Sequence, residues 1–510
     1  MENGVTATTP GPAAAFSAAQ ERGLVLLLGC AAALHVFVFS AAFPFFVNTD
    51  EQVHLDLAVK YSQGAIPRAL DAPCPEALQF IAIYGTIEYL WPPESQPARR
   101  ISPPVWTLPV KVSAPLILAK KELWKNVTNQ EASQPPLYYA FAGLWWDLGK
   151  ACGLDGGTLL YWLRFLNVIV VVALVWLGHR AARMIFPGNI FPRLAVPALL
   201  AFLPQTAFYS IQNDVLSPVC FGAAFVLLAR VLQADLPGAR LGMAAGLALA
   251  AAFLTKISNL PLLAVAALAV LFKTGRLFRA GKLRAAMPAV LSLAAGAGLP
   301  AVLWLAWCKI NFGDFTGSEG KIKFLGWTHK SFGEWWPHPI FTPRGLWIFL
   351  SGNLDTLWQG EILWRRQPLA LPAVDLVYAI LSVGLVALAV AALCRRPAVA
   401  GEPQRPALWL ALGCCAAAFA FFGFLSITYD FHDCFYPSRA HPYFTSGRLL
   451  LGALIPFLLL FVYGLDCALS RLKINWVKPA VLIGLILFML ISEIATDRMM
   501  FSNAYNWFHM

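Results

Sequence analysis

Ionisable side chains that could carry out acid–base chemistry follow the first hydrophobic segment of the chain. Asp50, Glu51 and His54 lie in the hexapeptide "TDEQVH", directly after a long run of mostly apolar residues. A carboxylate can accept the proton of an attacking hydroxyl group. Asp50 and His54 are four positions apart, so they share one face if this segment is helical. We expect Asp50 to be a general base oriented by a hydrogen bond from His54, and Glu51 to be a second catalytic carboxylate.

Polar groups also stand at the ends of three later hydrophobic stretches. They are Asn213 and Asp214 in "QNDVLSP", Lys256 in "FLTKISN" and Arg448 in "SGRLLLG". Asp50 and Asp214 have a simpler explanation as helix caps. Lys256 and Arg448 also have a simpler explanation, as anchors whose charged ends reach the membrane surface. Together, two carboxylates and two cations at one depth suit a reaction between a hydroxyl nucleophile and a phosphate-bearing lipid.

The composition is that of a membrane protein. Of the 510 residues, 59% are hydrophobic and 13% are charged, whereas soluble globular proteins carry roughly 25% charged residues. The mean hydropathy of +0.64 agrees with this difference. Most of the surface is therefore expected to face a lipid bilayer. We predict an all-α polytopic membrane protein.

The positive charges predict the orientation of the chain. The net charge is +11, and the lysines and arginines gather in short loops between apolar runs, as around Arg180, Arg279, Arg396 and Lys473. Such loops are typical of the cytoplasmic face, where they also meet anionic lipids. We therefore expect contact with membrane lipids and no binding of nucleic acid.

Placing the basic loops inside predicts about 11 transmembrane helices. Residues 1–22 would form a cytoplasmic tail, the C-terminus would be periplasmic, and the Ala- and Leu-rich composition favours a bacterial inner membrane. The expected spans cover about 23–46, 158–178, 193–211, 215–233, a short pair within 240–272, 286–309, 372–394, 406–427, 447–468 and 477–495.

Two long outer segments divide the chain. Residues 23–310 form the expected catalytic transmembrane module, which includes the outer loop 48–157. Residues 311–371 form a second outer segment, and residues 372–510 form a C-terminal transmembrane module. The stretch "SQPPLYYAFAGLWW", 133–146, is short and begins with a double proline, so we expect a juxtamembrane or re-entrant helix. If it spanned the membrane, the orientation of every later helix would reverse.

The outer segments have unusual compositions. The stretch 87–104 is too rich in proline for a continuous helix, and the stretch 326–364 is rich in tryptophan. Tryptophan is typical of interfacial helices, and aromatic platforms for sugar or lipid are the alternative. Cys74, Cys152 and Cys434 fall in these outer regions, which allows at most one disulfide.

Five short motifs occur in the order found in a known class of enzymes. They are "TDEQVH", "SQPPLYY", "QNDVLSPVCFGAAFVLL", "FLTKISNLPLL" and "SGRLLLGALIPFLLL". In this order they resemble the landmarks of a bacterial GT-C-like family of membrane proteins. The GT-C superfamily comprises polyprenyl-phosphate-dependent glycosyltransferases, such as protein O-mannosyltransferases and the lipid A aminoarabinose transferase. The chain departs from the pattern at Leu449, where an aromatic residue is usual, and at Pro456, which comes later than usual.

The resemblance implies transfer of a sugar from a polyprenyl-phosphate donor to an envelope acceptor on the periplasmic face. The acceptor would be a lipid, a glycan or a protein. The carboxylates of Asp50, Glu51 and Asp214 would be catalytic, and a single displacement would invert the anomeric carbon. Lys256 and Arg448 would stabilise the leaving phosphate, so no cofactor is expected. The full set of expected substrate-binding residues is His54, Gln134, Tyr138, Asn213, Lys256 and Arg448.

A divalent cation is a less favoured addition to this site. Asp50 and His54 could supply half of a metal site, with His432 or His441 from the loop before the tenth span. Two ligands at helical spacing are weak grounds for a metal, and the phosphate already has cationic partners. We expect no metal.

Two other functions remain open. A transporter or flippase of lipid-linked sugars would place its polar groups near the bilayer midplane on broken helices. Gly296, Gly298 and Pro300 in the seventh span favour that alternative, whereas the polar groups at the outer ends of the spans oppose it. A polymerase or ligase of lipid-linked glycans would use similar chemistry with a glycan as the donor.

Overall fold

The computed structural model describes residues 17–86, 102–364, 367–395, 404–472, 474 and 476–510. In these residues the regular structure is almost entirely helical, with two small two-stranded sheets. The prediction of an all-α polytopic membrane protein is confirmed. Several predictions fall outside the described residues: those for 1–16 of the tail, for most of the proline-rich stretch (87–101), and for Arg396 and Lys473.

Nine helices in the described part of the chain are long and apolar enough to cross a membrane. Two shorter apolar helices, α8 (Ile190–Ala201) and α10 (Ala239–Thr255), take the places of the third and fifth predicted spans. The predicted set of about 11 spans thus contains nine long helices and two short ones. Six of the nine are single α-helices: α1 (Ala18–Ala42), α7 (Gly156–Ile185), α12 (Leu283–Phe312), α15 (Pro372–Arg395), α16 (Gln404–Thr428) and α18 (Val477–Phe501). The other three include the 3-10 turns at their ends: Asn213–Gln233 with α9 (Ser217–Gln233), Ile257–Arg279 with α11 (Leu260–Arg279) and Gly447–Leu472 with α17 (Leu454–Leu469).

Helix α8 is short, and the irregular segment that follows it is stabilised by hydrogen bonds from a side chain of another helix. Its 12 residues rise about 18 Å, which is less than the ~30 Å of a hydrocarbon core. The chain continues through a buried 3-10 turn, η3 (Thr206–Tyr209). The Asn167 side-chain amide donates to the carbonyl oxygens of Phe208 (3.0 Å) and Ser210 (2.7 Å). Irregular backbone is tolerated at membrane depth when protein groups satisfy it in this way.

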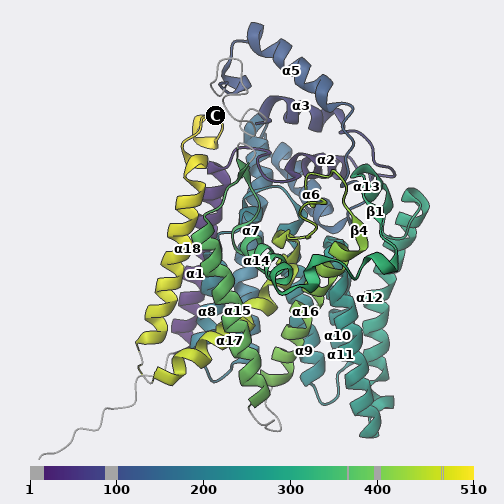
Figure 1. Ribbon diagram of the computed structural model, residues 1–510, viewed down its shortest axis with the longest axis vertical. Coiled ribbons are helices and arrows are strands. Elements are labelled where there is room, and N and C mark those ends of the chain that lie inside the picture. Colours follow the sequence, from purple (N-terminus) through teal and green to yellow (C-terminus); the bar gives the residue numbers. More distant parts are fainter. Residues whose placement is uncertain (1–16, 87–101, 365–366, 396–403, 473, 475) are drawn as a thin grey trace, which may run out of the picture.

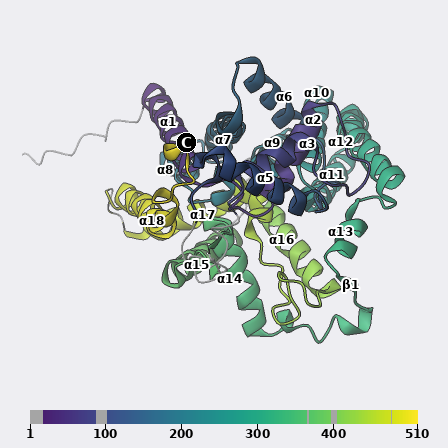
Figure 2. The same cartoon turned by 90° about the horizontal axis from the view of Figure 1, so that it is seen from above.

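Three short 3-10 turns meet at one end of the bundle. They are η4 (Asn213–Val215), η5 (Ile257–Asn259) and η8 (Gly447–Ala453), and η8 contacts both of the others. Each turn leads directly into a long helix: α9, α11 and α17, respectively. Helix α17 is largely buried and lies near the centre of the bundle (Figure 2). The N-terminal ends of three helices therefore converge at the place where the predicted polar residues stand.

The first outer segment covers this end of the bundle. It contains α2 (Glu51–Ser62), α3 (Pro75–Tyr84), a 3-10 turn η2 (Val105–Thr107), α5 (Val110–Trp124) and α6 (Leu137–Ala151), seen in the upper part of Figure 1. Helix α6 packs against α2 and is too short to count as a span. The stretch 133–146 thus contains a helix that is not a candidate span, as predicted, and its position relative to the membrane stays a prediction.

The second outer segment contains more regular structure than a loop. Its helices are α13 (Ser318–Phe324), the 3-10 turns η6 (Phe332–Glu334) and η7 (Pro339–Phe341), and α14 (Pro343–Gln359). Strand β1 (Thr328–His329) pairs with β4 (Tyr429–Asp430), and β2 (Leu363–Trp364) pairs with β3 (Gln367–Pro368). An isolated bridge between Asn48 and Ile362 joins this segment to the loop after α1. The end of α14 is thereby brought beside Asp50.

The end of the chain after α18 also lies at this end of the molecule. A final 3-10 turn, η10 (Trp507–His509), follows α18, and the C-terminus lies at the top in Figure 1.

At the start of α1, the Glu21 carboxylate accepts from His179 (2.8 Å) and pairs with Arg193. A further 3-10 turn, η9 (Ser470–Leu472), follows α17.

Glycines allow α10 and α12 to pack closely. A Cβ atom added at Gly242 would lie 2.1 Å from the Ala289 carbonyl oxygen, and one at Gly246 would lie 2.3 Å from that of Leu293. Gly296 faces the backbone of α10 in the same way. Helix α12 is continuous through Gly298 and Pro300, and Gly296 serves its packing against α10. The observation that favoured a transporter therefore has a structural explanation.

We expect Gly246→Ala to destabilise the bundle by about 1–3 kcal/mol, because the added methyl group meets backbone that cannot move independently of α12. Thermal unfolding of the detergent-purified protein would measure the loss. Gly298→Ala is the matched control, since nothing lies within 4 Å of a Cβ at that position on α12. Equal unfolding temperatures for the two variants would contradict this packing.

Candidate functional site

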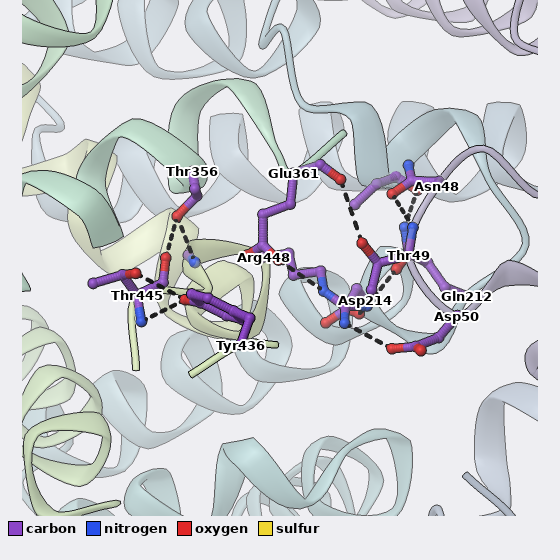
Figure 3. Close-up of polar contacts among 12 residues, drawn as sticks. Asn48, Thr49, Asp50, Gln212, Asp214, Thr356, Glu361, Tyr436, Thr445 and Arg448 are labelled. Carbon is purple, nitrogen blue, oxygen red and sulfur yellow. Dashed lines mark hydrogen bonds and ion pairs between the residues drawn. The ribbon is translucent and has the colours of Figure 1, made fainter. Parts of the chain in front are cut away.

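The Arg448 guanidinium lies at the centre of the converging turns (Figure 3). Its Nη2 atom lies 2.9 Å from Asp50 Oδ2, and its Nη1 atom lies 3.1 Å from Gln212 Oε1 and 3.5 Å from Asp214 Oδ2. These partners come from the loop before α2 and from the turn before α9. One cation therefore joins two of the three predicted catalytic carboxylates.

Asp214 lies between two cations. Lys256 Nζ is 2.5 Å from Asp214 Oδ1 and 3.3 Å from Asn213 Oδ1, while Arg448 faces the other carboxylate oxygen of Asp214. Asp214 is fully buried and Lys256 is 4% exposed. Burial lowers the pKa of Lys256, and the Asp214 carboxylate opposes that shift. Because both oxygens of Asp214 face cations, the helix-cap explanation for this residue is wrong.

Gln134 and Asn213 extend the network toward a second ion pair. The Asn213 amide donates to Gln134 Oε1 (3.2 Å), and the Gln134 amide donates to Glu131 Oε2 (2.6 Å). Glu131 in turn pairs with Lys321 of α13. Burial would raise the pKa of Glu131, but the Lys321 ammonium outweighs it and holds that pKa well below its usual range. Sequence reasoning missed Glu131 and Lys321, which lie 190 positions apart.

Asp50 stands in an unusual backbone conformation. Its φ of 65° lies in the left-handed region, which is uncommon for residues other than glycine. It occupies the N-cap position of α2, as the cap explanation expects, but its side chain makes no capping hydrogen bond. Its Oδ1 atom accepts from Gln130 Nε2 (3.1 Å), and its side chain is 21% exposed. A partly exposed carboxylate with fixed partners is suited to accept a proton from a ligand.

Glu51 faces the core and not the cluster. Arg164 of α7 binds it through Nη2, at 2.7 Å from Oε1 and 2.8 Å from Oε2. The backbone N–H groups of Phe46 (2.8 Å) and Ile211 (2.9 Å) donate to the same carboxylate. Both Glu51 and Arg164 are 0% exposed. This geometry supports a structural role, in contrast to the catalytic role predicted for Glu51.

His54 does not orient Asp50 as predicted. Its Nδ1 atom is 2.7 Å from the Tyr139 hydroxyl, and the two rings are stacked. Burial lowers the pKa of His54 to about 4, although nearby carboxylates such as Glu131 oppose the shift. Tyr138, another of the predicted substrate-binding residues, is 1% exposed and packs edge-on against Tyr139. His54 and Tyr138 therefore line the buried side of α2.

No group of three or more His, Cys, Asp or Glu side chains that could hold a metal occurs among the described residues. His432 bonds with Thr328 and Arg439 instead of joining Asp50 and His54. The metal site that Asp50, His54 and a histidine of the later loop could have formed is therefore not assembled. All ten cysteines are free in the described structure, so the disulfide that the sequence allowed is absent there.

Glu361 is a site residue that sequence reasoning missed. It follows α14, and its Oε2 atom lies 3.6 Å from Arg448 Nε. Its backbone oxygen accepts from Thr49 Oγ1 (3.4 Å), which fixes this turn beside Asp50. Burial raises the pKa of Glu361, and Arg448 opposes that shift. The only sequence signal was a charged residue in a tryptophan-rich stretch.

A set of hydroxyl groups holds the turn that carries Arg448 (Figure 3). Thr356 Oγ1 donates to the Thr445 carbonyl oxygen (2.7 Å) and accepts from the Gly447 N–H (2.7 Å). The Tyr436 hydroxyl bonds Thr445 Oγ1 (2.8 Å). A Cβ at Gly447 would lie 2.2 Å from the Asn353 carbonyl oxygen. The glycine before Arg448 therefore allows η8 to approach α14.

The fold and this cluster define a class: an all-helical, multi-pass membrane protein with a buried network of ionic groups at one end of its bundle. Residues 34–425 match the family described as "Predicted membrane protein (DUF2142)". The match covers most of the chain, which therefore belongs to that family. Asp50, Asp214, Lys256 and Glu361 lie inside the matched region, and Arg448 lies beyond it. A search of curated proteins found no match.

We expect Glu51→Gln to destabilise the fold by about 3–5 kcal/mol, because it leaves the Arg164 charge buried without a counter-charge. Thermal unfolding and the yield of folded protein would measure this loss. Glu122→Gln is the control, since the Glu122 side chain is 57% exposed and pairs with Lys125 on the surface. A Glu51→Gln protein of normal stability that lacked activity would instead support the catalytic role predicted from the sequence.

The free energy of unfolding should also decrease as the pH falls, because the folded state disfavours protonation of His54. The folded-state pKa of about 4 lies below the ordinary value of about 6.5, so the unfolded state binds more protons between these pH values. The contribution of His54 is complete above about pH 6.5 and is lost as the pH falls toward 4. Relative to His54→Gln, the wild type should lose roughly 3 kcal/mol over this range. Unfolding measured from pH 7 to pH 4 tests this, with the exposed His509→Gln as the control; parallel curves for wild type and His54→Gln would contradict it.

Proposed function

We propose that the protein is a membrane glycosyltransferase that moves a sugar from a polyprenyl-phosphate donor to an envelope acceptor. One observation carries the proposal: Lys256 and Arg448 converge on one carboxylate, Asp214, beside a partly exposed carboxylate, Asp50. The site therefore combines a candidate base with two cations at the end of a membrane bundle. The resemblance of the five motifs to GT-C enzymes supports the same activity.

In this proposal Asp50 is the general base. The acceptor hydroxyl attacks the anomeric carbon of the donor while Asp50 takes its proton. The bond between that carbon and the phosphate oxygen breaks, and the electron pair leaves with the polyprenyl phosphate. A single displacement of this kind inverts the anomeric carbon. The hydrogen bond from Gln130 and the ion pair with Arg448 hold Asp50 in place.

Lys256 and Arg448 stabilise the leaving phosphate. Asp214 occupies the position between them, which indicates that an anionic oxygen fits there. The donor phosphate would share or replace this carboxylate. The N-terminal ends of α9, α11 and α17 add partial positive charge to the same region. No cofactor or metal is part of this mechanism.

The expected location is a bacterial inner membrane, with the site and the C-terminus on the periplasmic face and the N-terminus in the cytoplasm. The lipid tail of the donor would lie between helices, and its acceptor would be a lipid, glycan or protein of the envelope. Exposed aromatic side chains of the second outer segment, such as Phe332 (66% exposed) and Trp336 (63% exposed), support contact with lipid or sugar there.

We expect Asp50→Asn to lower sugar transfer by about 10²–10⁴-fold, because the variant cannot accept the proton. Release of polyprenyl phosphate from a panel of radiolabelled polyprenyl-phosphate sugars would measure turnover by the purified protein. Mass spectrometry of envelope glycans, in a deletion strain complemented by each variant, would identify the product. The exposed Asp433→Asn is the control.

The same assays separate the alternatives. A transporter would release no sugar in detergent and would not depend on Asp50 as a base. A polymerase or ligase would release the lipid only from donors that carry a longer glycan. Undiminished transfer by Asp50→Asn would refute the assignment of Asp50.

A further inference from the structure

Two neighbouring atoms in the site lack hydrogen-bond partners. They are the Nε–H donor of Arg448 and the Oε1 acceptor of Glu361, both shielded from solvent. The closest approach of the two groups, between Arg448 Nε and Glu361 Oε2, is 3.6 Å, which is too long for a hydrogen bond. Buried polar atoms are nearly always paired, and exceptions are found where function requires them.

The other polar atoms of Arg448 are already engaged. Its Nη1 atom faces Gln212 and Asp214, and its Nη2 atom bonds Asp50. Nε is thus the nitrogen of this guanidinium that remains available to a ligand. The Glu361 side chain is 18% exposed, in contrast to that of Asp214 at 0%. Glu361 is therefore better placed than Asp214 to turn aside and admit a ligand.

We propose that Arg448 Nε and Glu361 Oε1 form a subsite for one neutral hydroxyl group of the transferred sugar. This inference rests on the proposed glycosyltransferase function and names its substrate class. A hydroxyl group inserted between the two residues donates to the carboxylate and accepts from the guanidinium with a single oxygen atom. Both orphan atoms then gain partners.

The charges of the pair select against other groups. An ammonium group would be attracted by Glu361 but repelled by Arg448, and a carboxylate would be attracted by Arg448 but repelled by Glu361. A site built to hydrogen-bond a hydroxyl group strongly rejects analogues that lack it, because its polar atoms are then left unpaired. The subsite therefore favours a sugar that carries a free hydroxyl at this position over an amino, acidic or deoxy sugar.

Glu361 is held by the second outer segment. The bridge from Asn48 to Ile362 and the hydrogen bond from Thr49 to Glu361 fix the turn that carries it. Asn48 and Thr49, which make these two contacts, immediately precede Asp50 in the chain. The base and the proposed sugar-binding carboxylate are thus positioned by one contact between the two outer segments, which explains how a remote segment takes part in sugar selection.

The test measures dissociation constants with the full chain in lipid nanodiscs. The probes are polyprenyl phosphate without sugar, polyprenyl-phosphate-linked neutral hexoses and pentoses, and the monodeoxy and amino analogues of the tightest binder. Glu361→Gln should weaken the tightest neutral sugar lipid about tenfold but should not weaken the binding of sugar-free polyprenyl phosphate, because it removes a negative charge beside Arg448. Glu319→Gln, an exposed position in the same outer segment, is the matched control and should change neither.

The analogues test the subsite in the unmodified protein. One monodeoxy analogue should bind the wild type about tenfold more weakly, and Glu361→Gln should not weaken that analogue further. An amino group at the same position should bind no better than the deoxy form. Equal weakening of sugar-linked and sugar-free lipid by Glu361→Gln, or no deoxy position coupled to Glu361, would overturn the subsite. Wild-type protein that failed to bind polyprenyl phosphate at all would instead overturn the proposed function, and the subsite with it.

Discussion

The described site depends on the burial of one guanidinium group. A buried charge is costly unless it is paired, and the cost is recovered only with well-placed partners. Arg448 finds these partners on three segments that are distant in the chain, at Asp50, Asp214 and Glu361. The fold can bury this cation only by bringing together the end of α1, the turn before α9 and the end of α14. The convergence of these elements is thus a requirement of electrostatics as much as of packing.

A second buried ion pair, between Glu51 and Arg164, stabilises the segment that carries Asp50. Asp50 and Glu51 are adjacent at the start of α2, yet one faces the cluster and the other faces Arg164 in the core. Asp50 precedes α2 in the left-handed conformation and Glu51 is the first residue of that helix, so the two neighbouring carboxylates lie in different environments. Glu51 ties the start of α2 to α7 and to the loop at Ile211. The strained backbone of Asp50 is maintained by these fixed neighbours.

The bundle and the outer segments make different contributions to the site. The bundle supplies Asp214, Lys256 and Arg448 from the irregular turns that precede α9, α11 and α17. Such turns leave backbone N–H groups without helical partners, and they concentrate partial positive charge where anionic ligands would bind. The outer segments supply Glu131, Lys321 and Glu361, which complete the polar network. The chemistry proposed above thus needs both parts.

The sequence alone determined the membrane class and most helix boundaries, because hydrophobic length and charge clusters are local properties of the chain. It also identified Asp50, Asp214, Lys256 and Arg448, since ionisable groups at the ends of apolar runs are conspicuous. Only the tertiary structure decided that Glu51 and His54 face away from the cluster, and that Glu361 joins it. The direction of a side chain at a helix start, and the partner of a charge on a distant loop, depend on which segments pack together, and no local pattern encodes that choice.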